Sequence, residues 1–331
     1  MTTPKVFITR RIPAEKLAQV VQHCQVDLWD EELPPPRQTL LEHVRGVEGL
    51  LCLLTDRIDA EVLDTAGPQL KVISNCAVGY DNIVVAAATR RGIPVGNTPG
   101  VLTDTTADFA FALLMAAARR VVEGDAFTRA GKWKTWGLTQ LLGRDVTGAT
   151  LGLIGFGRIG KGMAKRAGGF DMRVLYYDPV LQDDPYASQV RAHSVDLDTL
   201  LHQADFVSVH TPLSPETHHL IRTEALGKMK PTAILINTAR GPIVDPDALY
   251  QALKDGVIAY AALDVTEPEP IPMDHPLLTL PNLIIAPHIA SASVETRGKM
   301  IQMSINNLLA GLRGEHLPNC VNPEVYTASS T

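Results

Sequence analysis

Cysteine is scarce in this sequence, and the few cysteines do not occur in pairs. Four are present among 331 residues, and no two of them form a C-x-x-C pattern. This spacing excludes a disulfide framework and a zinc-ribbon site, and it is typical of a protein in a reducing compartment. We therefore expect free thiols at Cys24, Cys52, Cys76 and Cys320, which either lie in the core or have no specific role.

Long apolar runs and clusters of basic residues are absent as well. No apolar stretch reaches the ~18 residues that a membrane-spanning helix needs. The opening segment, residues 1–10, enters a strand pattern without the apolar centre of a signal peptide. The formal net charge is -6 and the pI is about 5.9, so neither nucleic acid nor an anionic membrane is expected as a partner. These features predict a cytoplasmic protein.

The hydrophobic content of 45% is enough for a sizeable core, and the length predicts two domains at about 150 residues each. Short apolar strands alternate with helical patterns, which is typical of parallel sheets covered by helices on both faces. The expected strands are 5–9, 49–54, 72–75 and 94–96, followed by a six-stranded set at 151–154, 173–177, 206–210, 233–237, 261–265 and 283–286. The prediction is an α/β fold with two doubly wound parallel sheets.

A long apolar segment lies between the two sets of strands. Residues 103–125 begin with Thr-Asp-Thr-Thr and continue as a helix that is apolar on nearly all sides. Such a helix is buried on more than one side, either as a hinge within one subunit or as an interface between two. We expect a homodimer, in which the extended segment 132–143 is an arm over the partner.

The most informative pattern spans residues 151–178. An apolar strand leads into Gly155, Gly157 and Gly160, a helical stretch follows, and a second strand ends at Asp178. The first glycine permits a tight turn, the second lets the backbone approach a pyrophosphate, and the third lets the helix pack closely on the sheet. The phosphates then lie at a helix N-terminus, which favours anions. This arrangement predicts a dinucleotide site.

Asp178 bears on which dinucleotide is bound. A carboxylate at the end of the second strand accepts hydrogen bonds from the ribose hydroxyls of NAD and repels the 2′-phosphate of NADP. NADH is therefore favoured. Arg158 and Arg173 are close in sequence, and they leave NADPH as the alternative.

Three further segments each follow an expected strand and carry catalytic residue types. They offer Arg240, a carboxylate at Glu267 or Glu269, and His288. Reduction of a 2-keto acid needs a cation that clamps the substrate carboxylate, for which the planar guanidinium of Arg240 is suited. It also needs a proton donor that works near neutral pH, and histidine is such a donor. A carboxylate on the far ring nitrogen would orient that histidine.

Three other histidines could bind a metal by their residue type, but they lack the sequence spacing of a metal site. His210, His218 and His219 have no carboxylate or cysteine at a matching spacing. We therefore expect no metal site.

Several ordered motifs resemble the D-isomer-specific 2-hydroxyacid dehydrogenase family, and within it the glyoxylate and hydroxypyruvate reductases. The resemblance extends over nearly the whole chain. It is carried by the segments 75–82 (NCAVGYDN), 97–107 (NTPGVLTDTTA), 155–160 (GFGRIG), 237–241 (NTARG), 263–270 (LDVTEPEP), 288–292 (HIASA) and 306–311 (NNLLAG).

The resemblance implies roles for individual residues. Arg240, Glu269 and His288 would be catalytic, with Glu269 rather than Glu267 as the partner of His288. The substrate would be bound by Arg240, by the backbone N–H groups of Val78 and Gly79, and by a pocket wall at Leu54, and Trp136 would reach the pocket of the partner subunit. The implied cofactor contacts are Thr106, Gly155, Gly157, Arg158, Ile159, Gly160, Asp178, Thr211, Thr238, Ala239, Arg240, Asp264, His288 and Ser291.

The resemblance also implies the domain organisation. A Rossmann cofactor domain, residues 100–287, would be inserted in a flavodoxin-like substrate domain made of residues 1–99 and 288–331. Hinges would lie near Pro99 and Pro287. The implied activity is the NAD(P)H-dependent reduction of glyoxylate or hydroxypyruvate to glycolate or D-glycerate.

Two alternatives remain within this fold. A phosphoglycerate dehydrogenase-like enzyme is the nearer one, although many of those chains carry a C-terminal regulatory domain and this sequence stops at Thr331. The other is an NADH-sensing corepressor-like binding protein, because one fold can serve several functions.

Overall fold

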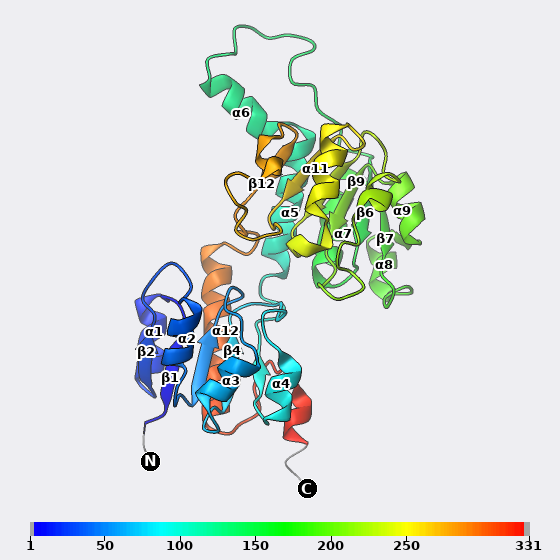
Figure 1. Cartoon of the computed structure of the whole chain (residues 1–331). Helices are drawn as coiled ribbons and strands as arrows, with labels where there is room; N and C mark the ends of the chain where they lie inside the picture. The colour runs from blue at the N-terminus through cyan, green and yellow to red at the C-terminus, as the bar shows by residue number, and fades with distance from the viewer. Residues whose placement is uncertain (1–2, 328–331) are drawn as a thin grey trace. The chain divides into compact units, whose positions relative to one another are not determined.

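The computed structural model describes residues 3–327 (Figure 1). The chain divides into two compact units. One unit is discontinuous and consists of the residues up to Leu102 together with those from Ser293 onward. The other, Thr103–Ala292, is inserted between these two segments.

The discontinuous unit contains a five-stranded parallel sheet. Its strands are β1 (Lys5–Ile8), β2 (Gln25–Leu28), β3 (Gly49–Cys52), β4 (Val72–Asn75) and β5 (Val95–Gly96). The order β2-β1-β3-β4-β5 confirms the predicted flavodoxin-like arrangement. Strand β2 was not among the expected strands, because as an edge strand it is only half-buried and its Gln-Val-Asp-Leu sequence lacks an apolar run.

Helices cover both faces of this sheet, and alternate strand residues enter two separate cores. Phe7, Leu50 and Ile73 belong to the core beneath one group of helices. Val6 and Leu51 belong to the core on the opposite face, to which the C-terminal helix also contributes. The first core is formed with α2 (Arg37–His43), α3 (Ala60–Ala66) and α4 (Val85–Arg90), and the second with α1 (Ala14–Val21) and α12 (Val294–Leu312).

The inserted unit contains a parallel sheet of seven strands, not six. The strands are β6 (Thr150–Ile154), β7 (Arg173–Tyr177), β8 (Ala192–Ser194), β9 (Phe206–Val209), β10 (Ile234–Asn237), β11 (Tyr260–Leu263) and β12 (Leu283–Ile285). The prediction missed β8, which has only three residues and lies at the sheet edge with Ala192 as its single buried side chain.

The strand order of this sheet is β12-β11-β10-β9-β6-β7-β8. The chain therefore builds outward from β6 in one direction through β7 and β8, and in the other through β9 to β12. Ligands of doubly wound sheets bind at the carboxyl ends of the strands where this order reverses, here beside β6. The helices on the two faces are α5 (Thr103–Ala118) and α7 (Arg158–Ala167) on one, and α9 (Leu197–Gln203), α10 (Thr223–Leu226) and α11 (Pro246–Lys254) on the other, with α8 (Pro185–Gln189) leading to β8.

The predicted single helix over 103–125 is wrong, because the segment forms two helices. Helix α5 ends at Ala118, and α6 (Val121–Arg129) begins after Arg120, whose φ of 53° lies in the left-handed region. Helix α5 is buried against α7 and the sheet, whereas α6 has no buried residue. Apolar composition predicts helix across both segments but does not reveal a break in backbone direction.

The four cysteines are free thiols, as predicted. Cys24 and Cys52 are buried, and desolvation raises the pKa of both thiols above the usual value. Within residues 3–327, no helix combines the length and the apolar character needed to cross a membrane.

His210 directly follows β9 and is poorly solvated. Its Nε2 lies 2.8 Å from the hydroxyl of Ser208, and among the described residues its buried Nδ1 has no hydrogen-bond partner. Burial disfavours the charged ring and lowers the pKa of His210 from 6.5 to about 3. Below pH 6.5 the unfolded chain therefore binds a proton at this position that the folded chain does not.

We expect His210 to make the protein acid-sensitive. Because the folded chain keeps this ring neutral, the unfolding free energy is unaffected by His210 above pH 6.5 and decreases as the pH falls toward 3. The decrease between pH 7 and pH 4.5 is about 2 kcal/mol. In the variant His210→Gln, the unfolding free energy should fall less over this range, as measured by urea unfolding. Equal pH slopes in the two proteins would contradict this assignment.

Candidate active site

The turn between β6 and α7 has the shape of a dinucleotide cradle. Gly155 has a φ of 96°, and a Cβ there would lie 2.7 Å from the backbone nitrogen of Thr211. A Cβ on Gly160 would collide with the carbonyl oxygen of Gly155, so the helix packs closely on the turn. At Gly157, by contrast, a Cβ would meet nothing within 4 Å. The middle glycine therefore faces open space, where a phosphate can approach the backbone.

The start of α7 fits the same purpose. Gly157 is the N-cap residue and supplies no side-chain hydrogen bond to the helix. The first N–H groups of the helix, at Arg158 and Ile159, are thus left to an external anion, which the helix dipole also favours. The residues present fit a bound pyrophosphate.

Asp178 follows β7 and lies beside the glycine turn. Its Oδ2 accepts a hydrogen bond of 2.9 Å from the N–H of Phe156, and its Oδ1 accepts from the N–H groups of Val180 and Leu181. The carboxylate therefore fixes the glycine turn and its own loop. Arg173 begins β7, so about five residues of extended chain, on the order of 16 Å, separate it from Asp178. Arg173 therefore lies at the amino end of the strand, and Asp178 lies at its carboxyl end.

Three threonines of the expected cofactor site have different surroundings. Thr211 packs directly against Gly155. Thr238, which follows β10, has a buried hydroxyl with no hydrogen-bond partner among residues 3–327. A buried hydroxyl without a partner is costly, and a polar group of a bound ligand would satisfy it. Thr106 is a buried residue of the first turns of α5.

The turn that carries Arg240 is fixed by a residue that the sequence interpretation did not single out. Asn237 is fully buried at the end of β10, where its amide nitrogen donates to the carbonyl of Arg240 and its oxygen accepts from the N–H of Ala239. Arg240 in turn donates from Nη1 to the carbonyl of Ala239 at 2.8 Å. A buried asparagine at the last position of an apolar strand is the signal that would have identified it.

The loop after β11 lies directly against this turn. A Cβ on Gly241 would collide with the carbonyl oxygen of Thr266, so the two segments pass each other with no room for a side chain. This contact brings Arg240 and the acidic loop to the same edge of the sheet.

Glu269 and His288 form the pair that the family resemblance implies. Nδ1 of His288 lies 2.6 Å from Oε1 of Glu269, and the second carboxylate oxygen accepts from the N–H of Thr266 at 3.4 Å. The bond orients the imidazole and leaves Nε2 as the nitrogen that can reach a substrate. His288 has a φ of 55°, so its backbone is held in an uncommon conformation.

Asp264 holds that conformation. Its carbonyl accepts the N–H of His288 at 2.9 Å, and its two carboxylate oxygens accept the N–H groups of Ile289 and Ala290. Burial raises the pKa of the Asp264 carboxyl, while these N–H groups oppose the shift. We expected a cofactor contact at Asp264, and both of its carboxylate oxygens are engaged with the turn that follows His288. Ser291 lies next in that turn and is partly buried.

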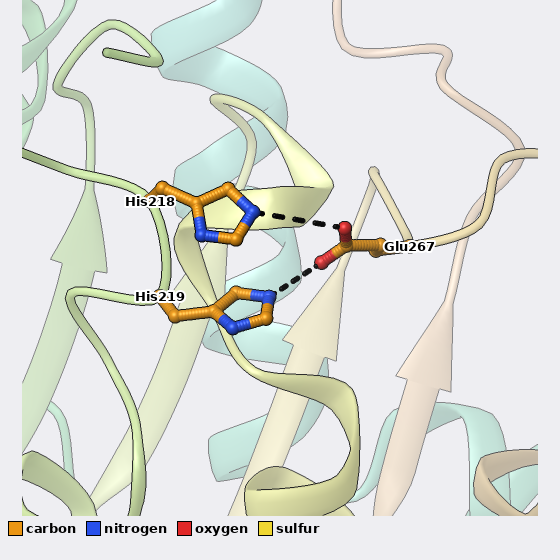
Figure 2. Close-up of side chains that lie close together, drawn as sticks. All are labelled: His218, His219 and Glu267. Carbon is orange, nitrogen blue, oxygen red and sulfur yellow. Dashed lines mark hydrogen bonds and ion pairs between the residues drawn. The ribbon is translucent and has the colours of Figure 1, made fainter. Parts of the chain in front are cut away.

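Glu267 has a different partner from Glu269. Its Oε2 lies 2.8 Å from Nε2 of His219, and its Oε1 lies 4.0 Å from Nε2 of His218 (Figure 2). The sequence pattern predicted no carboxylate partner for these histidines, because Glu267 is 48 residues away from His219 along the chain.

The expected substrate residues of the discontinuous unit follow β3 and β4. Two asparagine amides hold the loop after β4: the partly buried Asn97 donates to the carbonyl of Val78, and the buried Asn75 donates to the carbonyl of Gly79. No hydrogen bond joins the N–H group of Val78 or of Gly79 to any other described residue. Leu54 is partly buried two residues after β3.

Trp136 belongs to the arm that follows α6 and is 77% exposed in the single chain. In Figure 1 this arm leaves the body of the inserted unit as an extended loop. It returns at Arg144, whose N–H donates to the carbonyl of Ala118.

Comparison with known proteins agrees with this geometry. Residues 111–290 match the family model described as D-isomer specific 2-hydroxyacid dehydrogenase, NAD binding domain. A glyoxylate reductase of Korarchaeum cryptofilum is 55% identical over 323 residues, which is 97% of this chain and 97% of that protein.

Two solved structures are similar as well. A protein from Thermus thermophilus has a TM-score of 0.90 and 48% identity, and the match covers 96% of this chain and 99% of that one. An NADPH-dependent glyoxylate/hydroxypyruvate reductase from Sinorhizobium meliloti, in complex with NADP and malonate, has a TM-score of 0.85 and 29% identity, and the match covers 97% and 98%. The family model matches more than half of the chain, and the relatives match it over nearly its whole length. The chain therefore belongs to the D-isomer specific 2-hydroxyacid dehydrogenase family.

Proposed function

We propose that the protein reduces glyoxylate to glycolate, and hydroxypyruvate to D-glycerate, with NADH as its preferred cofactor. The observation that carries the chemistry is the 2.6 Å hydrogen bond between Glu269 and His288, on loops that follow neighbouring strands of the cofactor-binding sheet. The substrate assignment is supported by the glyoxylate reductase of Korarchaeum cryptofilum, which is 55% identical.

Three side chains share the work of this reaction. When bound, NADH supplies the hydride that forms the new C–H bond at the keto carbon. His288 donates a proton from Nε2 to the keto oxygen, and Glu269 stabilises the imidazolium before that transfer. Arg240 binds the substrate carboxylate and polarises the ketone. Solvent then returns a proton to His288.

We assign cofactor binding to the inserted unit, and we assign substrate binding to the discontinuous unit in addition to Arg240. The N–H groups of Val78 and Gly79 suit a carboxylate, because asparagine side chains fix both carbonyls and leave both donors available. Backbone donors held in this way bind an anion without reorganising. The pocket wall at Leu54 would then limit the size of the 2-keto acid.

The first prediction concerns Arg240. In the variant Arg240→Ala, kcat/KM for glyoxylate should fall by about 10²–10³, the usual cost of losing one group that stabilises transition-state charge. Oxidation of NADH with glyoxylate, hydroxypyruvate, pyruvate and phenylpyruvate provides the measurement. Arg222→Ala is the control, because Arg222 is an exposed arginine of the same unit paired with Glu224.

Two outcomes would refute this proposal. Near-wild-type turnover in Arg240→Ala would remove the arginine from the mechanism. Failure of the wild-type protein to reduce any of the four keto acids, despite measurable NADH binding, would favour the NADH-sensing function.

The second prediction concerns cofactor choice. Replacing Asp178 by Asn keeps one of the two oxygens that accept backbone N–H bonds and removes the charge that repels a 2′-phosphate. The ratio of kcat/KM for NADH to that for NADPH should fall by about tenfold or more, which corresponds to about 1.4 kcal/mol. The matched control is Asp183→Asn, which removes the charge of an exposed aspartate in the same loop. An unchanged ratio in Asp178→Asn would exclude the role given to this carboxylate.

We infer that two copies of the chain associate through the arm. Trp133, Trp136, Leu138 and Leu142 are between 61% and 79% exposed, and α6 adds the exposed side chains of Val121 and Val122. A contiguous set of exposed apolar side chains marks a surface that a partner covers. We assign it to a second copy, in which Trp136 reaches the substrate pocket of the other subunit.

Light scattering after size-exclusion chromatography tests this assembly. The wild-type protein should have twice the 35.8 kDa mass of one chain. A double variant, Leu138→Asp with Leu142→Asp, should raise the dimer dissociation constant at least about tenfold, because two charges would be buried without partners. Leu33→Asp, an exposed leucine of the discontinuous unit, serves as the control and should remain dimeric. A monomeric wild-type protein would end this inference.

A cytoplasmic location is the last part of the proposal. It is supported by the four free thiols, two of which are buried, since such thiols are typical of a reducing compartment.

A further inference from the structure

His218, His219 and Glu267 converge on one point outside the reacting groups. Each residue offers one ligand atom, and the three atoms lie within 4.8 Å of one another. The two imidazole rings are stacked, with centroids 4.0 Å apart and planes 27° apart. Figure 2 shows that both rings present Nε2 to the same carboxylate. Two nitrogens and a carboxylate oxygen are thus directed into one small volume.

Backbone contacts, not the side chains alone, hold the two histidines in place. The N–H of His218 donates to the carbonyl of Ser214, within a turn closed by the hydroxyl of Thr217. The N–H of His219 donates to the carbonyl of Pro242, and its φ of 50° lies in the left-handed region. The backbone positions of the two histidines therefore do not depend on the contact of their rings with Glu267.

We propose that these three residues bind a divalent transition metal ion, with Zn²⁺ as the preferred ion. Two imidazole nitrogens and one carboxylate oxygen form a recurrent zinc ligand set, in which a water completes the tetrahedron. Magnesium and calcium prefer sites made of oxygen ligands alone, so the two histidines select against them. The side chain of His218 is 51% exposed, which gives an ion access to the site.

The observed distances require only a small adjustment. Zinc bonds of about 2.0–2.2 Å place neighbouring ligand atoms roughly 3.4 Å apart in a tetrahedron. The pair His219–Glu267 at 2.8 Å must open slightly, and the pair His218–Glu267 at 4.0 Å must close. Rotation of the half-exposed His218 ring supplies the second change, which is measured to the other carboxylate oxygen of Glu267.

Asp245 lies behind the ring of His219. Its Oδ2 is 3.9 Å from Nδ1 of His219, on the side of the ring that faces away from Glu267, which is within ion-pair reach but is not a hydrogen bond. A negative charge at this position favours a cationic ligand on the other ring nitrogen. The same aspartate caps α11 through its other oxygen, so its own position is fixed.

The ion would join two loops that serve different parts of the active site. His218 and His219 lie in the segment that begins at Thr211, next to the glycine turn, whereas Glu267 lies two residues before Glu269. Metal binding would therefore restrain the loop that orients His288. Binding itself does not depend on the proposed reaction, so the site can be tested without measuring turnover.

Titration with Co²⁺ of the full-length protein, after removal of metal by a chelator, tests the site directly. Four-coordinate Co²⁺ gives visible absorption bands that the aqueous ion lacks, and Zn²⁺ added afterwards should abolish them by displacement. We expect one equivalent of Co²⁺ to bind per chain. A parallel measurement follows the melting temperature with added Zn²⁺, which should rise because the ion binds the folded state.

The variants separate metal binding from a simple hydrogen bond. His218→Ala removes a ligand but leaves the 2.8 Å bond between His219 and Glu267 intact. It should weaken Co²⁺ binding at least about tenfold, as should Glu267→Gln, since even outer-shell changes at metal sites have effects of this size. His193→Ala, an exposed histidine of the same unit, should bind Co²⁺ normally. The proposal is overturned if the wild-type protein binds no equivalent of Co²⁺, or if His218→Ala and His193→Ala bind it equally.

Discussion

The geometry of the candidate active site depends on one buried carboxylate. Asp264 accepts three backbone hydrogen bonds from the turn that begins at His288, one to its carbonyl and two to its side chain. Without them, a histidine with a φ of 55° would relax toward a more common backbone conformation. The bond between His288 and Glu269 is thus an outcome of backbone hydrogen bonding that the neighbouring strands β11 and β12 make possible.

The same principle recurs around the site. Asn237 fixes the turn of Arg240, Asp178 fixes the glycine turn, and Asn75 and Asn97 fix the loop of Val78 and Gly79. In each case a polar side chain near a strand end satisfies backbone groups of the loop that follows. The parallel sheets place the loops at the ends of the strands, and these short side chains fix the conformation of each loop. A site built in this way needs little reorganisation when a ligand arrives.

Much of this arrangement could be predicted from the sequence. The glycine turn, Asp178 and the order of the expected strands follow from local patterns of apolar residues and glycine. The pairing of His288 with Glu269 instead of Glu267 did not follow from the residues themselves, since both glutamates lie in one acidic loop, and only the resemblance to the family distinguished them. Strand β8 and the break at Arg120 were missed because three residues carry too little pattern, and a helix end without glycine or proline gives no local signal. The convergence of Glu267 on His218 and His219 depends on two loops brought together by the sheet, which spacing along the chain does not encode.

The discontinuous unit has a consequence for how the chain acquires its structure. Helix α12 contributes Ile305 and Leu308 to one of the two cores of that unit, against Val6 and Leu51. These N-terminal strands, β1 and β3, are synthesised roughly 240 to 290 residues before the helix that covers them. The inserted unit is continuous in sequence, so it can complete its own core first as the chain leaves the ribosome. Until α12 emerges, α1 alone covers that face of the first sheet, and part of its apolar surface stays open to aggregation and to chaperones.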